Sequence, residues 1–581
     1  MINANKERLL TFFQGQNQFE IPFFQRAYVW SDENWSVFLE HLNNEQNAHH
    51  AGQNSEHFLG TIITKQKDSQ KLGEHIVHLI DGQQRLTTIS IFLKALADTV
   101  VGDLINLKNQ LNQYLWFEDS YGNRRYRMIH SKIDEANFLK VMENPSSIKN
   151  TDTSAIILGY QYFHSRLKNL DDTQRNELQQ ILLNKFPVIS MLLDRDDDEQ
   201  EIFDTINSLG VRLTIGELLK NHLFKEPELI NLYEDQWLAV FGKTEQQVEY
   251  WSTERSSGRA KRDNMELLLY CFLIIETKKE IRLERLFFEY KNYLKEKTLA
   301  DKKAFLIRLS EMAKSFAEIP QGKDLHQISF SETDKRFYHL IENLEITTIL
   351  PLVLYLKINI TDNNDLFNSY SLLESFLALR QICKLTTKNY NNVFIQIIRQ
   401  LEAPTDATNP NSIDRSSNHL REILSSYNDD GNRIPKDVEV KNAFKSNVLS
   451  NKQAGEILFI ITLKESDSKY SDSKSQSSLT LSVEHIMPKD WKENWPQAQF
   501  SELEIFERNQ KLLTLGNLTL ITKNLNSKLR NQAWDDKKKT LKDYSTFKIT
   551  TEYLDIVNWN EKSIEERGLK LAESALEIWK F

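Results

Sequence analysis

Short apolar runs alternate with helical patterns in the first part of the chain. Residues 18–22, 58–65 and 76–80 are rich in apolar and β-branched side chains and are bounded by polar turn residues, which is typical of strands. The third run ends in a glycine-containing turn, and apolar positions three and four apart then follow over residues 86–99. A second strong helical pattern covers residues 201–224. This part is therefore predicted to alternate strands with helices.

The middle of the chain, from about residue 227 to about residue 428, has an almost entirely helical pattern. Apolar residues recur three and four apart in four stretches, at residues 267–277, 303–316, 337–358 and 370–385. Turn-forming residues at 427–435 end this region. A serine-rich segment at residues 464–480 follows, and we predict that it is a mobile insertion.

The length of the chain predicts several domains, because 581 residues exceed what one hydrophobic core supports. We place an N-terminal domain at residues 1–225, a helical middle region at 226–432 and a C-terminal domain at 433–581. The expected fold class is α+β, predominantly helical, with an all-helical middle.

Composition is that of a folded protein, with 40% hydrophobic and 27% charged residues. The net charge of −9 argues against a protein that coats nucleic acid uniformly, but it allows a DNA enzyme with a local basic patch. Cys271 and Cys383 lie far apart in apolar helical patterns, so we expect two core residues and no disulfide. No stretch is long and apolar enough to cross a bilayer, and a cytoplasmic location is expected.

The C-terminal part contains residues suited to phosphodiester hydrolysis. Glu484 and His485 end a strand-like run, and Asn517 and Asn526 follow in a loop and a predicted helix. Hydrolysis of a phosphodiester requires a base that takes a proton from water and a cation that neutralises charge on the phosphate. Histidine supplies the base near neutral pH, and oxygen ligands hold Mg²⁺ or another divalent metal. The order of elements predicts a ββα-metal arrangement.

The pattern Glu-His-Ile-x-Pro, then Asn-Leu-x-Leu, then an asparagine nine positions after the first resembles the HNH (His-Me finger) nucleases. The resemblance implies that His485 is the general base and that Glu484 and Asn526 hold the metal. Asn517 would complete the catalytic set by orienting His485 or bracing its loop. A lone Glu-His pair is more typical of a surface pair or a strand end, but three pieces in order favour the nuclease interpretation. The zinc-binding cysteines of many HNH enzymes are missing, so no structural zinc is expected.

Residues 511–550 form a basic segment in an acidic protein, with nine Lys or Arg against three Asp and a net charge of +6. Such a run is commonly a solvated helix face. Beside a candidate phosphodiesterase centre we interpret it as a surface for DNA phosphates. The residues expected to contact DNA are Lys528, Arg530, Lys537, Lys538 and Lys539. A second basic segment, at residues 251–264, is interpreted as a solvated interhelical loop, with contact to the DNA backbone as the alternative.

Two further motifs lie in the N-terminal part, one at residues 21–30 (IPFFQRAYVW) and one at residues 81–88 (DGQQRLTT). A glycine turn at a helix start favours a phosphate, and the Arg26 and Arg85 guanidinium groups would add charge. The ring of Tyr28 or Trp30 would offer a face for a base. A capped turn, with Arg85 paired to a carboxylate, explains the second motif about as well. The candidate nucleotide-binding residues are Gln25, Arg26, Asp81, Gly82, Gln83, Gln84, Arg85 and Thr87.

This pair of motifs resembles the N-terminal domain of the GmrSD family, and a third stretch at residues 203–214 (FDTINSLGVRLT) supports the resemblance. The resemblance implies a ParB/sulfiredoxin-like N-terminal domain that binds or hydrolyses a nucleoside triphosphate, GTP, ATP or UTP. It also implies a C-terminal HNH nuclease domain and a type IV, modification-dependent restriction enzyme. Sulfiredoxin chemistry is not expected, because no cysteine lies near residues 81–85. No P-loop pattern occurs, so a nucleotide would be held by the Gln/Arg motif.

We therefore expect an endonuclease, dependent on a nucleoside triphosphate and a divalent metal, that cleaves modified foreign DNA such as phage DNA in bacterial defence. Its partners would be DNA and nucleotide, with no membrane, and a homodimer is left open. One alternative is a nucleotide-switched DNA-binding protein with an inactive nuclease domain. Another is a helical subunit of a larger defence complex.

Overall fold

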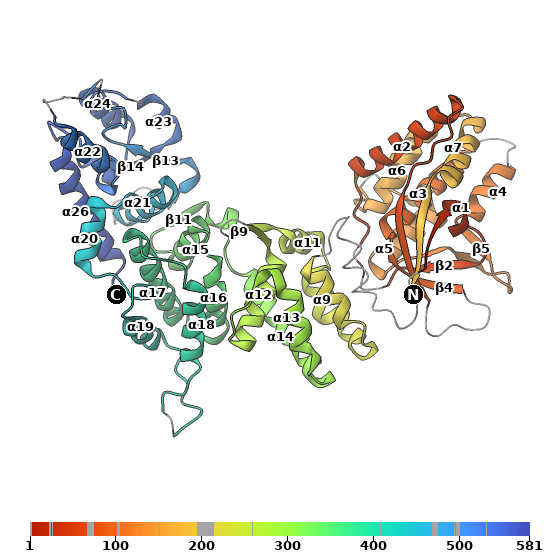
Figure 1. The fold of residues 1–581 in the computed structure, drawn as a ribbon, viewed down its shortest axis with the longest axis horizontal. Helices are drawn as coiled ribbons and strands as arrows, with labels where there is room; N and C mark the ends of the chain where they lie inside the picture. Colours follow the sequence, from red (N-terminus) through yellow and green to blue (C-terminus); the bar gives the residue numbers. More distant parts are fainter. Residues whose placement is uncertain are drawn as a thin grey trace. The chain divides into compact units, whose positions relative to one another are not determined.

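The computed structural model divides into two compact units, Met1–Pro227 and Glu228–Phe581. It describes residues 3–22, 25, 27–66, 75–100, 105–149, 151–193, 214–257, 260–406, 408–466, 475–492, 494–495, 500–529 and 531–581. No helix in these ranges combines the length and apolar character that a membrane span needs. The protein is a mostly helical α+β chain, as the sequence predicts (Figure 1).

Unit 1 contains a mixed six-stranded sheet with the strand order β1-β8-β3-β4-β2-β7. β2 runs parallel to both of its neighbours, β4 and β7, whereas β3 is antiparallel to β4 and parallel to β8. The carboxyl ends of β4, β2 and β7 therefore meet at one edge of the sheet. The strands are β1 (Asn3–Arg8), β2 (Asn17–Glu20), β3 (Gly60–Gln66), β4 (His75–Asp81), β7 (Met128–Ile129) and β8 (Pro187–Leu193).

The three strands predicted from the sequence are confirmed as β2, β3 and β4, and the first predicted helix is confirmed as α3 (Gln83–Asp98). α3 packs closely on α6, because a Cβ at Gly159 would lie 2.8 Å from Ile91 Cδ1. The rings of Phe38, Phe92 and Phe163 fill the core edge to face. The other helices of unit 1 are α1 (Leu9–Phe12), α2 (Asp32–His50), α4 (Ile105–Gln113), α5 (Lys132–Glu143), α6 (Ala155–Leu167), α7 (Asp172–Lys185) and α9 (Ile215–Leu223); a small sheet pairs β5 (Trp116–Glu118) with β6 (Arg124–Tyr126).

Unit 2 is built largely of helices (green to blue in Figure 1). Its longer helices are α11 (Glu245–Ser252), α12 (Asn264–Thr277), α13 (Leu286–Lys295), α14 (Leu299–Ala317), α15 (Thr333–Leu344), α16 (Leu350–Asn359), α17 (Asn363–Ile382), α18 (Tyr390–Leu401), α19 (Ser417–Ser426), α20 (Asp437–Ser446), α21 (Asn451–Ser466), α22 (Glu502–Lys511), α23 (Lys523–Leu529), α24 (Trp534–Tyr544) and α26 (Glu561–Ile578). The pattern at residues 337–358 divides into α15 and α16, because Glu345 ends α15 in the left-handed conformation.

The middle region is not all-helical, which corrects the sequence-based expectation. The segment expected to be an interhelical loop forms a hairpin of β9 (Glu254–Ser257) and β10 (Ala260–Asp263). β11 (Gln327–Ser329) pairs with β12 (Ser475–Ser477) from the serine-rich segment. These strands are short and polar, so hydrophobic periodicity gives no signal for them.

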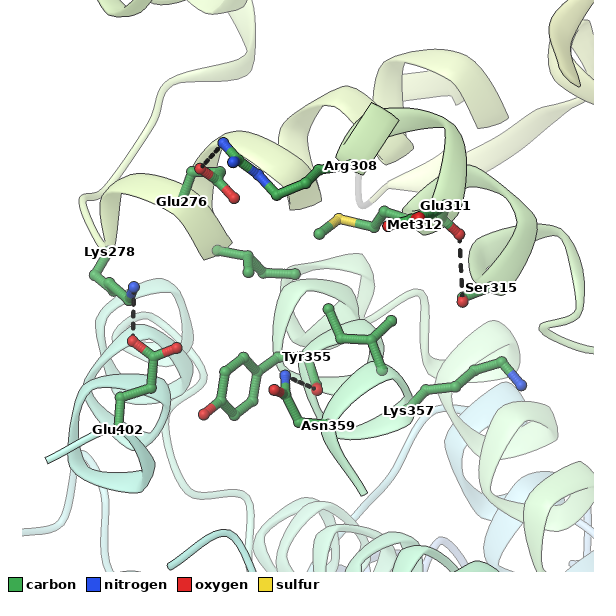
Figure 2. A pocket seen from close by; sticks show the side chains of 12 residues that line it. Glu276, Lys278, Arg308, Glu311, Met312, Ser315, Tyr355, Lys357, Asn359 and Glu402 are labelled. Carbon is green, nitrogen blue, oxygen red and sulfur yellow. Dashed lines mark hydrogen bonds and ion pairs between the residues drawn. The ribbon is translucent and has the colours of Figure 1, made fainter. Parts of the chain in front are cut away.

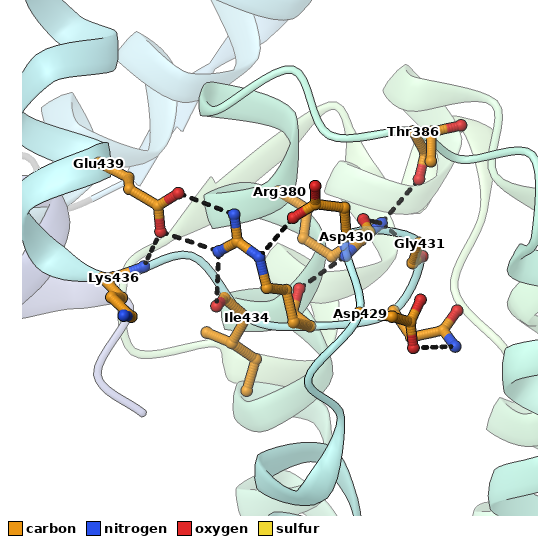
Figure 3. A network of polar contacts seen from close by, with 10 residues as sticks. Arg380, Thr386, Asp429, Asp430, Gly431, Ile434, Lys436 and Glu439 are labelled. Atoms are coloured by element: carbon orange, nitrogen blue, oxygen red, sulfur yellow. Dashed lines mark hydrogen bonds and ion pairs between the residues drawn. The ribbon is translucent and has the colours of Figure 1, made fainter.

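The turn at residues 427–435, where a domain boundary was expected, is fixed to α17 by a buried arginine (Figure 3). Arg380 donates hydrogen bonds to the carbonyl groups of Arg433 (2.6 Å), Thr386 (2.6 Å) and Gly431 (2.7 Å). Arg433 in turn pairs with Glu439 at the start of α20. One side chain of the helical region thus fixes the chain where it enters the C-terminal part.

We predict that Arg380→Met lowers the free energy of unfolding of unit 2 by roughly 3–5 kcal/mol, because several carbonyl groups lose a charged donor at once. Urea unfolding followed by tryptophan fluorescence measures this change. Arg282→Met is the matched control on an exposed site, with an expected effect below about 0.5 kcal/mol. Equal effects in the two variants would contradict the role given to Arg380.

Candidate functional site

The His-Asn motif of unit 2 lies on a strand pair followed directly by a helix. β13 (Leu481–His485) is antiparallel to β14 (Leu518–Thr522), with His485 opposite Leu518, and α23 begins at the next residue. This order of two strands and a helix agrees with the order expected from the sequence. Because side chains alternate along a strand, Glu484 and His485 point to opposite faces of the pair.

His485 is half-buried at the end of β13. Burial, together with the positive charges of Lys489 and Lys537, lowers the pKa of its imidazole to about 4. The imidazole is therefore neutral near pH 7. A neutral imidazole has a ring nitrogen free to accept a proton, as a general base requires, and the lowered pKa also makes it a weaker base than a free histidine.

Glu484 is buried, and its carboxylate forms an ion pair with Lys537 of α24. The ammonium of Lys537 is completely buried and also donates a hydrogen bond of 2.7 Å to the carbonyl of His485. Burial raises the pKa of Glu484 and lowers the pKa of Lys537, and the attraction between the two charges opposes both shifts. Lys537 therefore lies inside the domain, and we leave it out of the DNA-contacting set expected from the sequence.

Asn517 is completely buried and uses the full hydrogen-bonding capacity of its amide. Its oxygen accepts from the Met487 backbone N–H (2.9 Å) and from the Trp559 indole (3.0 Å). Its nitrogen donates to the carbonyl groups of Met487 (2.8 Å) and Leu512 (3.0 Å). Asn517 thus braces the two residues that follow His485, which is one of the two roles suggested by the sequence, and makes it a positioning residue.

Asn526 lies on α23, half-buried against β13. Its amide nitrogen donates to Ser482 Oγ (3.0 Å) and to the carbonyl of Val483 (3.3 Å). Ser482 and Glu484 share one face of β13, because they are two residues apart. The motif asparagine is therefore attached to the strand that ends in His485.

The Glu484 carboxylate and the Asn526 amide oxygen are of the donor type that a hard divalent cation prefers, and a metal here would share Glu484 with Lys537. In the part of the chain that the structure describes, no group of three or more His, Cys, Asp or Glu could hold a metal. A metal at this site would thus have few protein ligands and would keep water and phosphate oxygens, as Mg²⁺ commonly does.

The remaining basic residues differ in their surroundings. Lys528 is exposed, with its ammonium 4.0 Å from the centre of the Tyr544 ring. Lys538 is half-buried, 3.2 Å from Asp535, and Lys539 is exposed. Arg530 lies outside the described residues. The sequence reasoning missed Lys489, an exposed residue whose charge acts on His485; its position four residues after the histidine was the available signal.

In unit 1 the two N-terminal motifs follow β2 and β4 at the same edge of the sheet, and glutamines join them. Gln25 of the first motif donates to the carbonyl groups of Leu79 (2.6 Å) and Ile80 at the end of β4. Gln84 of the second motif accepts from the Val29 backbone N–H (2.9 Å) and donates to the carbonyl of Ala27. Gln84 thus holds the backbone of the first motif, and Gln25 holds the end of the strand that leads into the second motif, so the two motifs lie side by side.

The turn of the second motif requires glycine, because Gly82 has φ +100° and a Cβ there would lie 3.0 Å from Ile62 Cγ1. Arg85 is partly buried and donates to Asp81 Oδ2 (3.0 Å) and to the carbonyl of Thr61 (2.5 Å). The sequence left open a phosphate site or a capped turn in which Arg85 pairs with a carboxylate. The structure contains the second feature, the pair of Arg85 with Asp81. The Arg85 Nε is buried without a partner among the described residues.

Other predicted residues of this site have varied placements. Gln83 and Thr87 are buried in the first turns of α3. Tyr28 does not offer a ring face to a base, because it is buried and its hydroxyl bonds Thr88 (2.7 Å) and the Trp35 indole (2.8 Å). Arg26 and residues 203–213 of the third motif lie outside the described residues.

An open pocket of about 560 Å³ lies between α12, α14 and α16 (Figure 2). None of the residues singled out from the sequence lines it. Its charged side chains largely pair with one another, as in Arg308 with Glu276 (2.9 Å) and Lys278 with Glu402 (2.6 Å). Because both signs of charge are present and paired, we assign no ligand to it.

The comparisons with known proteins agree with these two motif regions. Residues 9–224 match a family model described as GmrSD restriction endonuclease, N-terminal domain. Residues 434–574 match GmrSD restriction endonucleases, C-terminal domain. Both matches define a restriction endonuclease, a class of protein that cleaves DNA in defence. The chain belongs to the GmrSD restriction endonuclease family, whose two domains cover most of its length. No curated protein matches the chain.

We predict that Asn517→Ala lowers the free energy of unfolding by roughly 3–5 kcal/mol, because four hydrogen-bonding groups in the interior lose their partner. Urea unfolding measures the change, and hydrogen exchange of the Ile486 and Met487 amides locates it. Asn531→Ala, at an exposed position, is the control. Unchanged exchange at Met487 would contradict the bracing role.

We predict a pH-dependent stability for unit 1 from Asp134, because burial raises the pKa of its carboxyl to about 6. Between pH 4 and pH 6 the folded state keeps this proton while the unfolded chain releases it, so the free energy of unfolding falls as pH rises. The fall is about 2–3 kcal/mol over this window and stops above about pH 6. Urea unfolding across the pH range tests this.

Asp134→Asn removes this slope while keeping an acceptor for the Tyr28 N–H. Asp32→Asn, at an exposed position in α2, leaves the slope in place. A slope that survives in Asp134→Asn would show that another group titrates.

Proposed function

We propose that the protein is an endonuclease, dependent on a nucleoside triphosphate and a divalent metal, that cleaves modified foreign DNA in bacterial defence. One observation carries the proposal. His485 stands at the end of β13, with Glu484 beside it and the Asn526 side chain hydrogen-bonded to the same strand. The family supports DNA as the substrate.

In the proposed reaction His485 takes a proton from the attacking water through its free ring nitrogen. Asn517 holds the backbone after His485, so the imidazole stays in one place during the reaction. Glu484 and Asn526 would hold the divalent metal, which neutralises charge on the phosphate when bound. The charge of Lys537 favours the ionised form of the Glu484 carboxyl inside the domain and so opposes the rise of its pKa on burial.

The DNA backbone is proposed to contact the exposed or partly exposed basic side chains near this site. Positive charges at such positions neutralise phosphates and make binding dependent on salt. Lys489 is added to the set predicted from the sequence, because it is exposed and lies four residues after His485. The set is Lys489, Lys528, Lys538 and Lys539, and Arg530, which lies outside the described residues, is kept from the sequence-based prediction.

The nucleotide is proposed to bind at the edge of the unit 1 sheet where β2 and β4 end. Ligands of open sheets commonly bind outside the carboxyl ends of parallel strands. The start of α3 at Gly82 offers backbone N–H groups to a phosphate, and Arg85 supplies a cation. The candidate residues remain Gln25, Arg26, Asp81, Gly82, Gln83, Gln84, Arg85 and Thr87, with GTP, ATP or UTP as the ligand.

Two variants separate the two proposed activities. His485→Ala is expected to lower plasmid cleavage with Mg²⁺ or Mn²⁺ at least about 100-fold, because the general base is lost, and to keep triphosphate hydrolysis. Arg85→Ala is expected to abolish triphosphate hydrolysis. DNA cleavage is followed on gels, with plasmid and with modified phage DNA as substrates. Triphosphate hydrolysis is followed by the release of phosphate.

His419→Ala, on α19, is the matched control, because His419 is half-buried like His485, and it is expected to keep both activities. Equal cutting by wild type and His485→Ala would refute the catalytic assignment. Tight, nucleotide-dependent DNA binding without any cutting would favour the alternative, a DNA-binding switch with an inactive nuclease domain.

A further inference from the structure

A buried polar turn follows β7 at the edge of the sheet where the two N-terminal motifs lie. It consists of His130 and Ser131, with Asp134 in the first turn of α5, and each is about 5% exposed or less. Neither family motif of this region contains these residues. β7 is only two residues long, so the sequence pattern gave no sign of the turn.

The topology brings this turn next to both motifs. β7 and β4 lie on either side of β2, and all three strands are parallel. α3 begins two residues after the end of β4, and α5 begins three residues after the end of β7, so the two helices start from strands on opposite sides of β2. The loop of the first motif leaves β2 between them.

Hydrogen bonds connect the turn to both motifs. Asp134 accepts from the backbone N–H of Tyr28 in the first motif (2.7 Å). The His130 ring Nε2 lies 3.5 Å from Thr87 Oγ1 in the second motif. The start of α5 is thus in direct contact with both motifs.

Two polar atoms of the turn have no hydrogen-bond partner among the described residues, the Nδ1 of His130 and the Oγ of Ser131. Both are shielded from solvent, where an unpaired polar atom is costly. Ser131 occupies the N-cap position of α5, yet its side chain does not cap the helix. Serine at this position ordinarily accepts a hydrogen bond from the first turn. Both atoms therefore have capacity left for a ligand.

The turn offers hydrogen-bond donors to an anion, beside the Asp134 and Glu135 carboxyl groups in the first turn of α5. Burial lowers the pKa of His130 to about 3, so the ring is neutral and carries one N–H. A serine hydroxyl can donate, and a helix N-terminus adds unpaired N–H groups and a partial positive charge. α5 has 12 residues and α3 has 16, so both are long enough for this effect. Neutral donors at helix starts are a common environment for phosphate groups.

We propose that His130, Ser131 and the first turn of α5 form a second phosphate-binding wall of the nucleotide site, opposite the wall formed by the start of α3. The phosphate chain of the nucleotide lies between the two helix starts. Asp134 is a positioning residue that fixes the first motif through the Tyr28 N–H. This inference rests on the proposed nucleotide binding in unit 1.

The test is a calorimetric titration of the full chain, separately with GTP, ATP, UTP and inorganic tripolyphosphate. Ser131→Ala and His130→Phe are each expected to weaken binding of the triphosphates and of tripolyphosphate at least about tenfold, as the loss of one hydrogen bond to a charged group does. His130→Phe keeps the ring packing on Phe138. The matched control is Ser154→Ala, at the N-cap of α6, where the serine likewise does not cap its helix.

Thermal unfolding of each variant without ligand separates a loss of binding from a loss of fold. Weaker binding by Ser131→Ala at an unchanged unfolding temperature, with Ser154→Ala equal to wild type, supports the second wall. Wild-type affinity in Ser131→Ala and in folded His130→Phe overturns it and leaves a buried water as the partner of these atoms. If neither the wild-type chain nor Arg85→Ala binds a triphosphate, the result contradicts the proposed nucleotide site itself rather than the second wall alone.

Discussion

The ammonium of Lys537 determines the local structure at the end of β13. It pairs with the buried carboxylate of Glu484 and donates a hydrogen bond to the carbonyl of His485. A carboxylate buried without a counter-charge destabilises a domain by several kcal/mol, so this pair allows Glu484 to remain charged inside unit 2. The charge state of one motif residue and the backbone position of the next therefore depend on one side chain of α24.

The same physical solution recurs where other loops hold candidate site residues. Asn517 satisfies the backbone that follows His485, Gln84 satisfies the backbone of the first N-terminal motif, and Gln25 satisfies the end of β4 just before the second motif. Arg380 does the same for the turn that enters the C-terminal part. The backbone of a loop lacks the regular hydrogen bonds of a helix or a sheet. Its N–H and C=O groups are therefore bonded by side chains that are distant in the sequence. The polar side chains of a motif thus mainly hydrogen-bond the backbone of nearby loops. Only side chains with an unpaired polar atom can also bind a ligand.

Part of this structure follows from the sequence. Helical periodicity located α12, α14 and α17, and alternation located β2, β3 and β4, because each of these elements buries a regular face. The order of β13, β14 and α23 was also predictable, because the Glu-His pair, Asn517 and Asn526 follow one another in the order and spacing of the nuclease motif. The short strands β7 and β9–β12 were not predictable, because a strand of two to four residues is too short to show a pattern and is held by its partners.

The placement of Lys537 shows why composition alone misjudges a basic surface. Nine positive charges in residues 511–550 predict a face for DNA, yet one of them is neutralised inside the domain. The signal was present in the spacing, because Trp534, Lys537 and Leu541 are three and four residues apart and occupy one buried face of α24. A lysine on the apolar stripe of a helix needs an acidic partner in the core. Glu484, the acidic residue beside the motif histidine, is that partner.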